Sequence, residues 1–320
     1  MMKKLMSLVC AVLMLISLAA CAAPADDGKL VVGICQIETH PALDAATQGF
    51  QDALVKAMGE GKVEFLVKNA AGDTNTINTI INDFVSKDVD LILANSTPVL
   101  QAAAAATTVI PILGTSVTEY GVALKLDDFD GLVGGNISGT SDLAPLDKQA
   151  DMILQWVPDA KTVGLLYCSA EANSKYQVNE VKKFLEAKSL TVKEYPFSSS
   201  ADLAAVTEDA ASECDAIYVP TDNTVANSAA MVDGICRGKK IPVIAGEEGI
   251  CKGCGVATLS ISYYDLGVTT GEMAAKILKG EEKISEMKIQ YAANTTQKYN
   301  AEICQELGLT PLDGYTAIEG

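Results

Sequence analysis

Short runs of apolar residues alternate along the chain with longer stretches in which apolar residues recur every three to four positions. In the first part of the chain these runs predict strands at residues 30–35, 64–68, 91–94 and 110–113. The periodic stretches between them predict helices, one of which begins near Pro41. Strands that are apolar along their whole length and are separated by helices predict a parallel sheet covered on both faces.

The same rhythm starts again after a glycine-rich segment at residues 131–139. It begins with a predicted helix at residues 143–156. Further strands are predicted at residues 162–167, 191–197, 216–219 and 242–245. The chain therefore contains two α/β halves that share a plan without sharing a sequence.

The pattern changes after residue 261. A helical stripe at residues 263–278 precedes a strand near 287–291 and a helix near 301–307, which we interpret as returns of the chain to each half. We expect an α/β fold of two Rossmann-like lobes with parallel sheets, joined by a hinge of several crossings. The expected lobe 1 is residues 30–139 plus 263–285, and the expected lobe 2 is residues 140–262 plus 286–320.

The first residues have the features of an export signal. Lys3 and Lys4 precede an apolar run at residues 5–18, which is about as long as a signal-peptide core and short for a membrane span. Small residues then precede Cys21, and this resembles the lipobox of bacterial lipoproteins. The resemblance implies that residues 1–20 are the signal peptide and that Cys21 carries a lipid. Residues 21–29 would then tether an exported protein to the outer face of the cell membrane. An ordinary signal with an incidental cysteine is the alternative.

Charge and composition exclude several classes of function. The 41 acidic residues outnumber the 24 lysines and arginines, and a net charge of −17 disfavours nucleic-acid binding, which needs a basic face. His40 is the single histidine, so a histidine-rich metal site is excluded, and no G-x-S-x-G motif accompanies it. The sequence contains no P-loop, and the glycines at residues 134–139 do not match a dinucleotide fingerprint. We therefore expect a protein that is not an enzyme and uses neither a metal nor a cofactor.

Cysteines after the signal offer one motif. Cys251 and Cys254 form a single C-x-x-C pair, and a second pair at zinc-site spacing is missing from the sequence. A disulfide is plausible on an exported chain, and a pair of free thiols is the equal alternative.

Six stretches spread over nearly all of the chain after the signal carry a family resemblance: QIETHPALD at 36–44, SVT at 116–118, GTSDLAP at 139–145, SAEANS at 169–174, PTDNT at 220–224 and YYDLG at 263–267. They resemble the substrate-binding lipoproteins of ABC transporters with the type I periplasmic binding fold, and most closely their tryptophan/tyrosine/phenylalanine-type branch. Glu119 departs from the family pattern, which has an aspartate followed by a proline there.

The resemblance implies a monomeric receptor that captures a small-molecule ligand between its lobes and delivers it to an ABC permease. It implies an amino acid with an aromatic or large apolar side chain. A sugar- or nucleoside-binding receptor of the same fold is the alternative.

Polar residues follow the predicted strands of lobe 1. Hydroxyl groups and the backbone N–H groups of a helix N-terminus suit the carboxylate of an amino acid. Helix capping is the structural alternative for the residues at the helix start, and turn chemistry is the alternative for those after the fourth strand. We expect His40, before Pro41, to cap a helix or to form a hydrogen bond. The ligand-binding candidates in lobe 1 are Gln36, Ser96, Thr97, Thr115, Ser116 and Thr118.

The second lobe offers acids and amides at the corresponding strand ends. An ammonium group removed from water needs a carboxylate partner, and we expect Asp222 or Glu247 to supply it. A solvated acidic turn is the alternative for Glu247 and Glu248. The candidates in lobe 2 are Glu171, Asn173, Ser174, Asp222, Asn223 and Glu247.

Overall fold

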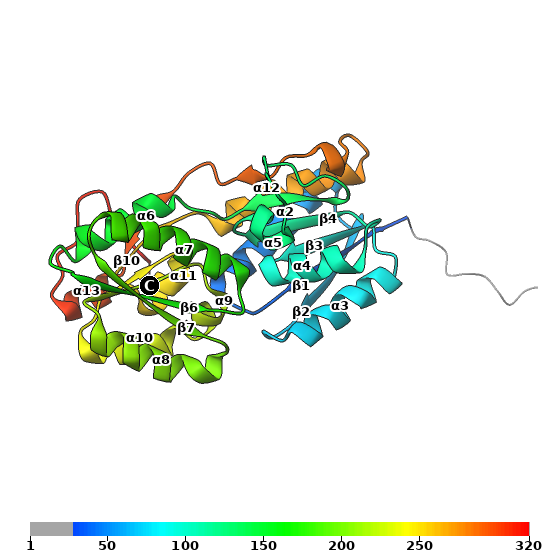
Figure 1. Ribbon diagram of the computed structural model, residues 1–320. Coiled ribbons are helices and arrows are strands. Elements are labelled where there is room, and N and C mark those ends of the chain that lie inside the picture. Colours follow the sequence, from blue (N-terminus) through cyan, green and yellow to red (C-terminus); the bar gives the residue numbers. More distant parts are fainter. Residues whose placement is uncertain (1–27, 320) are drawn as a thin grey trace, which may run out of the picture.

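Two β-sheets organise the computed structural model, which describes residues 28–319 (Figure 1). The sheet of lobe 1 is parallel throughout, with the order β11-β5-β4-β3-β1-β2. Its strands are β1 (Leu30–Gln36), β2 (Val63–Asn69), β3 (Leu91–Asn95), β4 (Ile112–Val117), β5 (Ile137–Ser141) and β11 (Gln290–Tyr291). Its helices are α2 (Pro41–Met58), α3 (Thr74–Ser86), α4 (Thr97–Ala106), α5 (Tyr120–Leu124), α12 (Tyr263–Leu278) and the 3₁₀ turn η1 (Ile284–Glu286).

Lobe 2 is built on a seven-stranded sheet with the order β13-β12-β10-β9-β8-β6-β7, in which β12 runs antiparallel to β10. Its strands are β6 (Thr162–Cys168), β7 (Thr191–Phe197), β8 (Ala216–Val219), β9 (Val243–Ala245), β10 (Ala257–Ser260), β12 (Thr296–Tyr299) and β13 (Thr316–Ala317). Its helices are α6 (Leu146–Trp156), α7 (Ala172–Ala187), α8 (Ser200–Glu213), α9 (Asn223–Asn227), α10 (Ala229–Lys239), α11 (Glu248–Cys254) and α13 (Ala301–Leu307).

Strand β3 shows why a central strand is apolar at every position. All five of its residues are buried. Leu91 and Leu93 pack on one face of the sheet with Phe50, while Ile92 and Ala94 pack on the other face with Phe84. A strand between two helical layers buries side chains on both faces, so it needs apolar residues at every position.

The two lobes repeat one topology, as predicted. The first five strands of each lobe pair in the order second, first, third, fourth, fifth: β2-β1-β3-β4-β5 in lobe 1 and β7-β6-β8-β9-β10 in lobe 2. In sheets of this order the strands are added to one side of the first strand and then, from the third strand on, to its other side, and ligands bind outside the carboxyl ends of the first and third strands.

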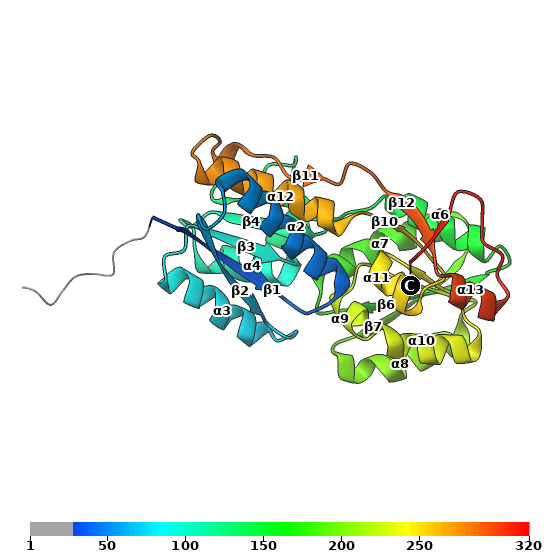
Figure 2. The ribbon, with the colours of Figure 1, turned by 180° about the vertical axis from the view of Figure 1, so that it is seen from behind.

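The chain crosses between the lobes after β5, after β10 and after β11. The view from behind in Figure 2 shows α12 lying along α2 of lobe 1. Glycines at the contact, Gly49 on α2 and Gly267 on α12, leave room for the backbone of the facing helix. This close pair fixes the returning chain to lobe 1.

The observed crossings lie a few residues beyond the expected lobe boundaries. Strand β5 continues to Ser141 in the sheet of lobe 1, and β11 pairs with it, although residues 286–320 were expected in lobe 2. The last glycine of the segment at 131–139, Gly139, lies within β5. A side chain at Gly139, whose φ is +147°, would collide with the backbone of Gly114 in β4.

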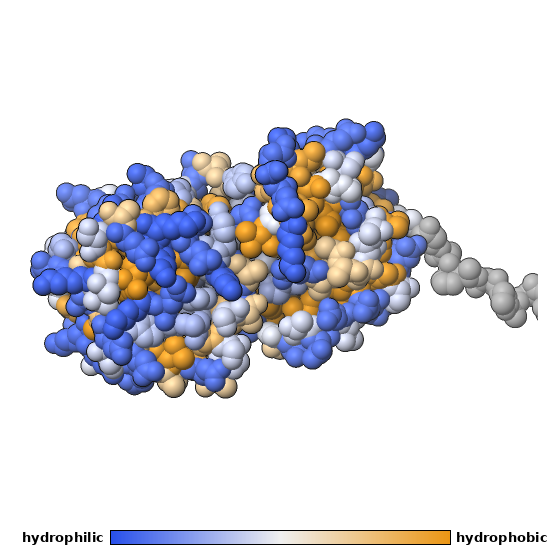
Figure 3. All heavy atoms as spheres, in the orientation of Figure 1, coloured by the Kyte–Doolittle hydropathy of each residue, from blue (hydrophilic) through white to orange (hydrophobic). Residues whose placement is uncertain are grey.

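The surfaces of the lobes differ in polarity. Figure 3 shows that hydrophilic residues cover most of this face of lobe 2, while hydrophobic residues reach the surface over larger areas of lobe 1. Ion pairs such as Lys182 with Glu194 and Lys193 with Glu213 lie on lobe 2. Within residues 28–319 none of the helices combines the length and the apolarity that a membrane crossing requires. The expected signal peptide and Cys21 lie outside the described residues.

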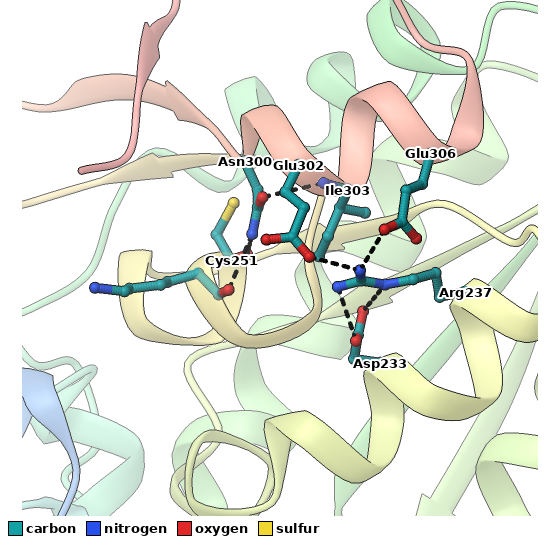
Figure 4. A network of polar contacts seen from close by, with 8 residues as sticks. Asp233, Arg237, Cys251, Asn300, Glu302, Ile303 and Glu306 are labelled. Carbon is teal, nitrogen blue, oxygen red and sulfur yellow. Dashed lines mark hydrogen bonds and ion pairs between the residues drawn. The ribbon is translucent and has the colours of Figure 1, made fainter. Parts of the chain in front are cut away.

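The last return of the chain is fastened to lobe 2 by a polar network (Figure 4). Arg237 on α10 forms ion pairs with Asp233 on its own helix and with Glu302 and Glu306 on α13. Asn300 caps α13 and also donates to the backbone carbonyls of residues 251 and 252 on α11. These contacts hold α13 against the outer layer of the lobe.

The seven cysteines of the described chain are all buried and free. Cys251 and Cys254 both lie on the buried side of α11 and are not joined by a disulfide. Of the two alternatives for the C-x-x-C pair, the structure has the free thiols. Burial raises the pKa of both thiols, so they are packed as small apolar side chains.

Candidate functional site

The carboxyl ends of β1, β3 and β4 in lobe 1 face those of β6, β8 and β9 in lobe 2. A small cavity of about 20 Å³ remains between them. This space holds about one water molecule and is too small for an amino acid. Its lining comes from both lobes and from two of the crossings: His40, Leu43, Ser116, Asp142, Asn173, Thr221, Asp222, Asn223, Ala226, Glu247 and Tyr263.

On the side of lobe 1, hydroxyl groups are buried without hydrogen-bond partners. Ser96 and Thr97 stand at the start of α4, and Ser116 lies near the end of β4. The hydroxyl groups of all three are buried and unpartnered. Helix capping therefore does not explain Ser96, since its side chain caps nothing. Ser116 lines the cavity, whereas Ser96 and Thr97 do not. All three hydroxyls are unpaired in a place where an unpaired polar group is costly.

Both serines, Ser96 and Ser116, also have unusual backbone conformations. Ser96 has a φ of +132° and Ser116 a φ of +53°, both in regions that favour glycine. Such conformations cost about 1–3 kcal/mol each and are concentrated at functional sites. The strand ends of lobe 1 thus combine backbone strain with unpaired hydroxyls.

On the side of lobe 2, the acids are already bonded. Asp222 accepts from the backbone N–H groups of Cys168 at 2.7 Å and Val225 at 3.0 Å. Glu247 accepts from the N–H groups of Gly249 and Ile250 at the start of α11. The solvated turn considered for Glu247 is wrong, because this side chain is only 3% exposed.

Burial dominates the electrostatics of these acids. It raises the pKa of Glu247 to about 7, against the opposing effect of its two backbone N–H donors. Burial, with Glu171 nearby, likewise raises the pKa of Asp222. Neither lysine nor arginine lines the cavity, so the closed lobes confine acids without a cation.

Glu171 and Asn173 hold the start of α9 and the end of β8 together. Glu171 accepts from the backbone N–H groups of Asn223 and Thr224. The Asn173 amide donates to the Thr221 carbonyl at 2.9 Å, and its own Oδ1 is buried and unpartnered. Asn173 therefore lines the cavity with a free acceptor, while Glu171 and Ser174 lie behind it.

Two polar contacts join the lobes at the cavity. His40 Nε2 lies 3.2 Å from Asn223 Oδ1, and the hydroxyls of Thr118 and Thr221 are 3.5 Å apart. His40 forms a hydrogen bond, as expected, but its side chain does not cap α2. Its other ring nitrogen is buried without a partner.

Two predicted residues face inward to lobe 1 instead of the cavity. Gln36 donates to Asp44 and accepts from Thr47. Thr115 accepts from the hydroxyl of Thr140 in the neighbouring strand. Both interactions position the strand ends, and neither side chain lines the cavity.

Asp142 and Tyr263 are not among the residues predicted from the sequence, but the structure brings them together at the cavity. The Tyr263 hydroxyl donates to Asp142 Oδ2 at 2.9 Å, although the two residues are 121 positions apart. Asp142 directly follows β5, a strand that the sequence did not predict, and Tyr263 is the first residue of α12, where the chain returns to lobe 1. Their signal in the sequence was their place in the stretches at 139–145 and 263–267.

Metal binding finds no support in the part of the chain that the structure describes. Among residues 28–319 there is no group of three or more histidine, cysteine, aspartate or glutamate side chains arranged to hold an ion. The cavity instead offers hydroxyls, amides and carboxylates, which suit an organic ligand with both donors and acceptors.

Comparisons of the sequence with known proteins point to transport. The model of the ABC transporter substrate binding protein family matches residues 31–314. The tyrosine-binding protein of Clostridioides difficile (strain R20291) is 38% identical over 257 residues, which cover 78% of this chain and 73% of that protein.

Two solved structures compare differently with this one. The ABC domain in complex with L-Trp from Streptococcus pneumonia is 31% identical, with a TM-score of 0.86 over 91% of this chain and 100% of that chain. The ligand-free, open structure of a substrate binding protein with adhesive properties from Clostridium difficile is 37% identical, but its TM-score is 0.69 over 91% and 99%. The less identical protein superposes better, so the lobes here are arranged more as in the L-Trp complex than as in the open structure.

Proposed function

Because the chain belongs to the ABC transporter substrate-binding protein family, we propose that it binds a free aromatic amino acid between its lobes and delivers it to the permease of an ABC transporter. This is a family of solute-binding proteins and not of enzymes, in agreement with the sequence analysis. The observation that carries the aromatic ligand is the 38% identity to a tyrosine-binding protein, and the similarity to a structure holding L-Trp supports it.

The binding mode that we propose places the ligand's carboxylate on lobe 1. The unpartnered hydroxyls of Ser96, Thr97 and Ser116 supply donors, and Ser96 and Thr97 lie at the N-terminus of the ten-residue helix α4. The positive end of a helix dipole favours a bound anion there. Asp222 and Glu247 were expected to meet the ammonium group, but both oxygens of each acid accept backbone N–H groups of lobe 2.

Ligand entry requires the lobes to separate. The cavity of about 20 Å³ cannot admit an amino acid, and the contacts of His40 with Asn223 and of Thr118 with Thr221 close it. The three crossings form the hinge about which the lobes would open, and ligand binding would favour the closed form.

A thermal-shift screen of the purified protein tests the ligand class. The twenty amino acids, common sugars and nucleosides are compared, and tyrosine, tryptophan or phenylalanine should stabilise the protein most. A ligand at 100 times its dissociation constant adds about 2.7 kcal/mol to the free energy of unfolding. Small-angle scattering with the best ligand should show a more compact particle. If sugars or nucleosides stabilised the protein and amino acids did not, the protein would be a sugar- or nucleoside-binding receptor of the same fold.

We further propose that the protein is exported, anchored through a lipid on Cys21 and monomeric. Its sequence features at residues 1–21 support the anchor, and its family supports a place outside the cytoplasm. Cells fed a labelled fatty acid should label the wild type and the Cys10→Ala control but not Cys21→Ala. Light scattering of the protein lacking residues 1–21 should give the mass of one chain.

A further inference from the structure

Asp142 is the carboxylate at the cavity that the folded chain leaves half unpaired. It lies in the crossing between β5 and α6 and is only 4% exposed. Its Oδ2 accepts from the hydroxyl of Tyr263 at 2.9 Å. Its Oδ1 is buried and has no hydrogen-bond partner. A buried polar oxygen without a partner is rare in a folded protein and indicates a place for a missing group.

The other two acids at the cavity differ from Asp142 in this respect. Both oxygens of Asp222 accept backbone N–H groups, from Val225 and Cys168. Both oxygens of Glu247 accept backbone N–H groups at the start of α11. These two acids already cap the starts of α9 and α11, whereas Asp142 has one oxygen without a hydrogen bond.

The surroundings of Asp142 supply no positive charge. Tyr263 from α12, Tyr120 from α5, Thr118 after β4 and Glu247 before α11 face it, and all of these are neutral or acidic. Burial is the main reason that the pKa of Asp142 lies above its usual range. An isolated buried carboxylate must take up a proton or meet a cation.

We propose that Asp142 Oδ1 accepts the α-ammonium group of the ligand and thereby makes the site reject molecules that lack this group. The assignment rests on the proposed function, since it presumes an amino-acid ligand. With the ammonium in place, the carboxylate is ionised and paired on both oxygens. The carboxylate of the ligand lies toward Ser116, which lines the same cavity.

The same geometry explains why a desamino analogue should bind poorly. Closing the lobes on an acid without an amino group leaves Asp142 either ionised and unpaired or protonated. In the second case the proton comes from solvent, so binding of the analogue takes up one proton and strengthens as pH falls. Asparagine at position 142 is uncharged and has the same shape, so it removes this penalty and the attraction for ammonium together.

Calorimetric titration of two ligand pairs tests the assignment. L-tyrosine is compared with 3-(4-hydroxyphenyl)propionate, and L-tryptophan with indole-3-propionate, on the wild type, Asp142→Asn and Asp147→Asn. Asp147 is exposed at the start of α6 and provides the same chemical change outside the cavity. Asp142→Asn should weaken amino-acid binding at least ~30-fold and tighten binding of the desamino acids. Asp147→Asn should bind as the wild type does.

The pH dependence gives a second readout. Between pH 8 and pH 5, binding of the desamino acids to the wild type should tighten. In Asp142→Asn this trend should become smaller, and the part that remains reflects Glu247 and Asp222, whose pKa values are also raised. If Asp142 had only a structural role, Asp142→Asn would weaken binding of the amino acid and of its desamino analogue by the same factor. Tyr263→Phe keeps the carboxylate but removes its hydroxyl donor, so it should shift the same selectivity to a smaller extent even if Asp142→Asn folds poorly.

The outcomes separate the two proposals. If the wild type bound aromatic amino acids and Asp142→Asn bound them equally well, this assignment would be overturned and the proposed function would stand. If the wild type bound no amino acid, the proposed function would fail and the assignment would fail with it.

Discussion

The two lobes present opposite kinds of edge to the cavity that they share. The edge of lobe 1 ends in hydroxyls without partners, on Ser96, Thr97 and Ser116, and two of these residues have strained backbones. The edge of lobe 2 ends in the acids Asp222 and Glu247, and each of their oxygens is bonded to a backbone N–H group. The same topology therefore places unpaired hydroxyls at the edge of lobe 1 and fully hydrogen-bonded acids at the edge of lobe 2.

This difference shows that a buried polar residue at a strand end is not by itself a ligand contact. Asp222 and Glu247 serve as helix caps, which need no ligand. The hydroxyls of lobe 1 gain no hydrogen bond from folding, so their burial is compensated only when something binds. Changes in lobe 1 should accordingly affect binding, and changes in lobe 2 should affect stability.

The largest expected effect is a loss of the closed, ligand-free form as pH rises. Glu247 has its pKa raised to about 7 by burial, and the pKa of Asp222 is also raised. Between their ordinary values and these raised ones, the closed form binds more protons than the open or unfolded chain, so its stability falls with increasing pH. Scattering at pH 5 should show a more compact ligand-free protein than at pH 8. Glu247→Gln should reduce the difference, and identical profiles at both pH values would contradict it.

Next in size is the loss of stability in Asp222→Ala. The change leaves the N–H groups of Cys168 and Val225 without their acceptor inside lobe 2. Losing a helix cap and a buried acceptor should lower the free energy of unfolding by about 2–3 kcal/mol. Urea unfolding without ligand measures this. A loss below about 0.5 kcal/mol, the level of an ordinary surface change, would show that these bonds are unimportant.

Ser116→Ala should have the converse effect in lobe 1. Its hydroxyl makes no hydrogen bond within the protein, so the free energy of unfolding should change little. Loss of one hydrogen bond to a carboxylate should weaken amino-acid binding by about 1.5–2 kcal/mol, or more than tenfold. Calorimetry and urea unfolding of the same sample separate the two effects. Ser212→Ala removes a hydroxyl on the exposed surface of α8, outside the cavity, and is the control for the effect on binding. Unchanged affinity would remove Ser116 from the carboxylate site.

Arg237→Ala should have the smallest effect, because its ion pairs lie on the outer surface of lobe 2. Glu302 and Glu306 on α13 are well exposed, and ion pairs of this kind contribute about 1 kcal/mol or less. Hydrogen exchange should become faster in α13 but not in α12, which is fixed to lobe 1. If exchange became faster by the same factor in both helices, loss of the Arg237 ion pairs would destabilise lobe 1 as well as lobe 2.

Much of the architecture followed from periodicity. The apolar runs at residues 91–94 and 216–219 predicted buried strands because a central strand excludes polar residues from both faces. The family resemblance is confirmed by the match over residues 31–314. Two strands at one edge of the sheet of lobe 2 were not predicted from this pattern. β12, with the sequence TQKY, and β13 are short, partly exposed and polar enough to resemble loops.

Strand ends also located five of the eleven residues that line the cavity. Ser116, Asn173, Asp222, Asn223 and Glu247 were chosen from sequence, and the structure places all five at one cavity. The carboxyl ends of parallel strands share one edge of a sheet, so their neighbours in sequence gather there whatever the loops do.

The tertiary structure alone decided which of these groups are free. Local sequence shows that Asp222 and Glu247 are acids before short helices, but not that both oxygens of each find N–H groups. Asp142 and Tyr263 meet across 121 positions because two crossings pass side by side through the hinge. The sequence determines which chemical groups lie near the strand ends. Whether a group is left unpaired depends on every neighbour that folding brings to it, and those neighbours come from segments far apart in the chain.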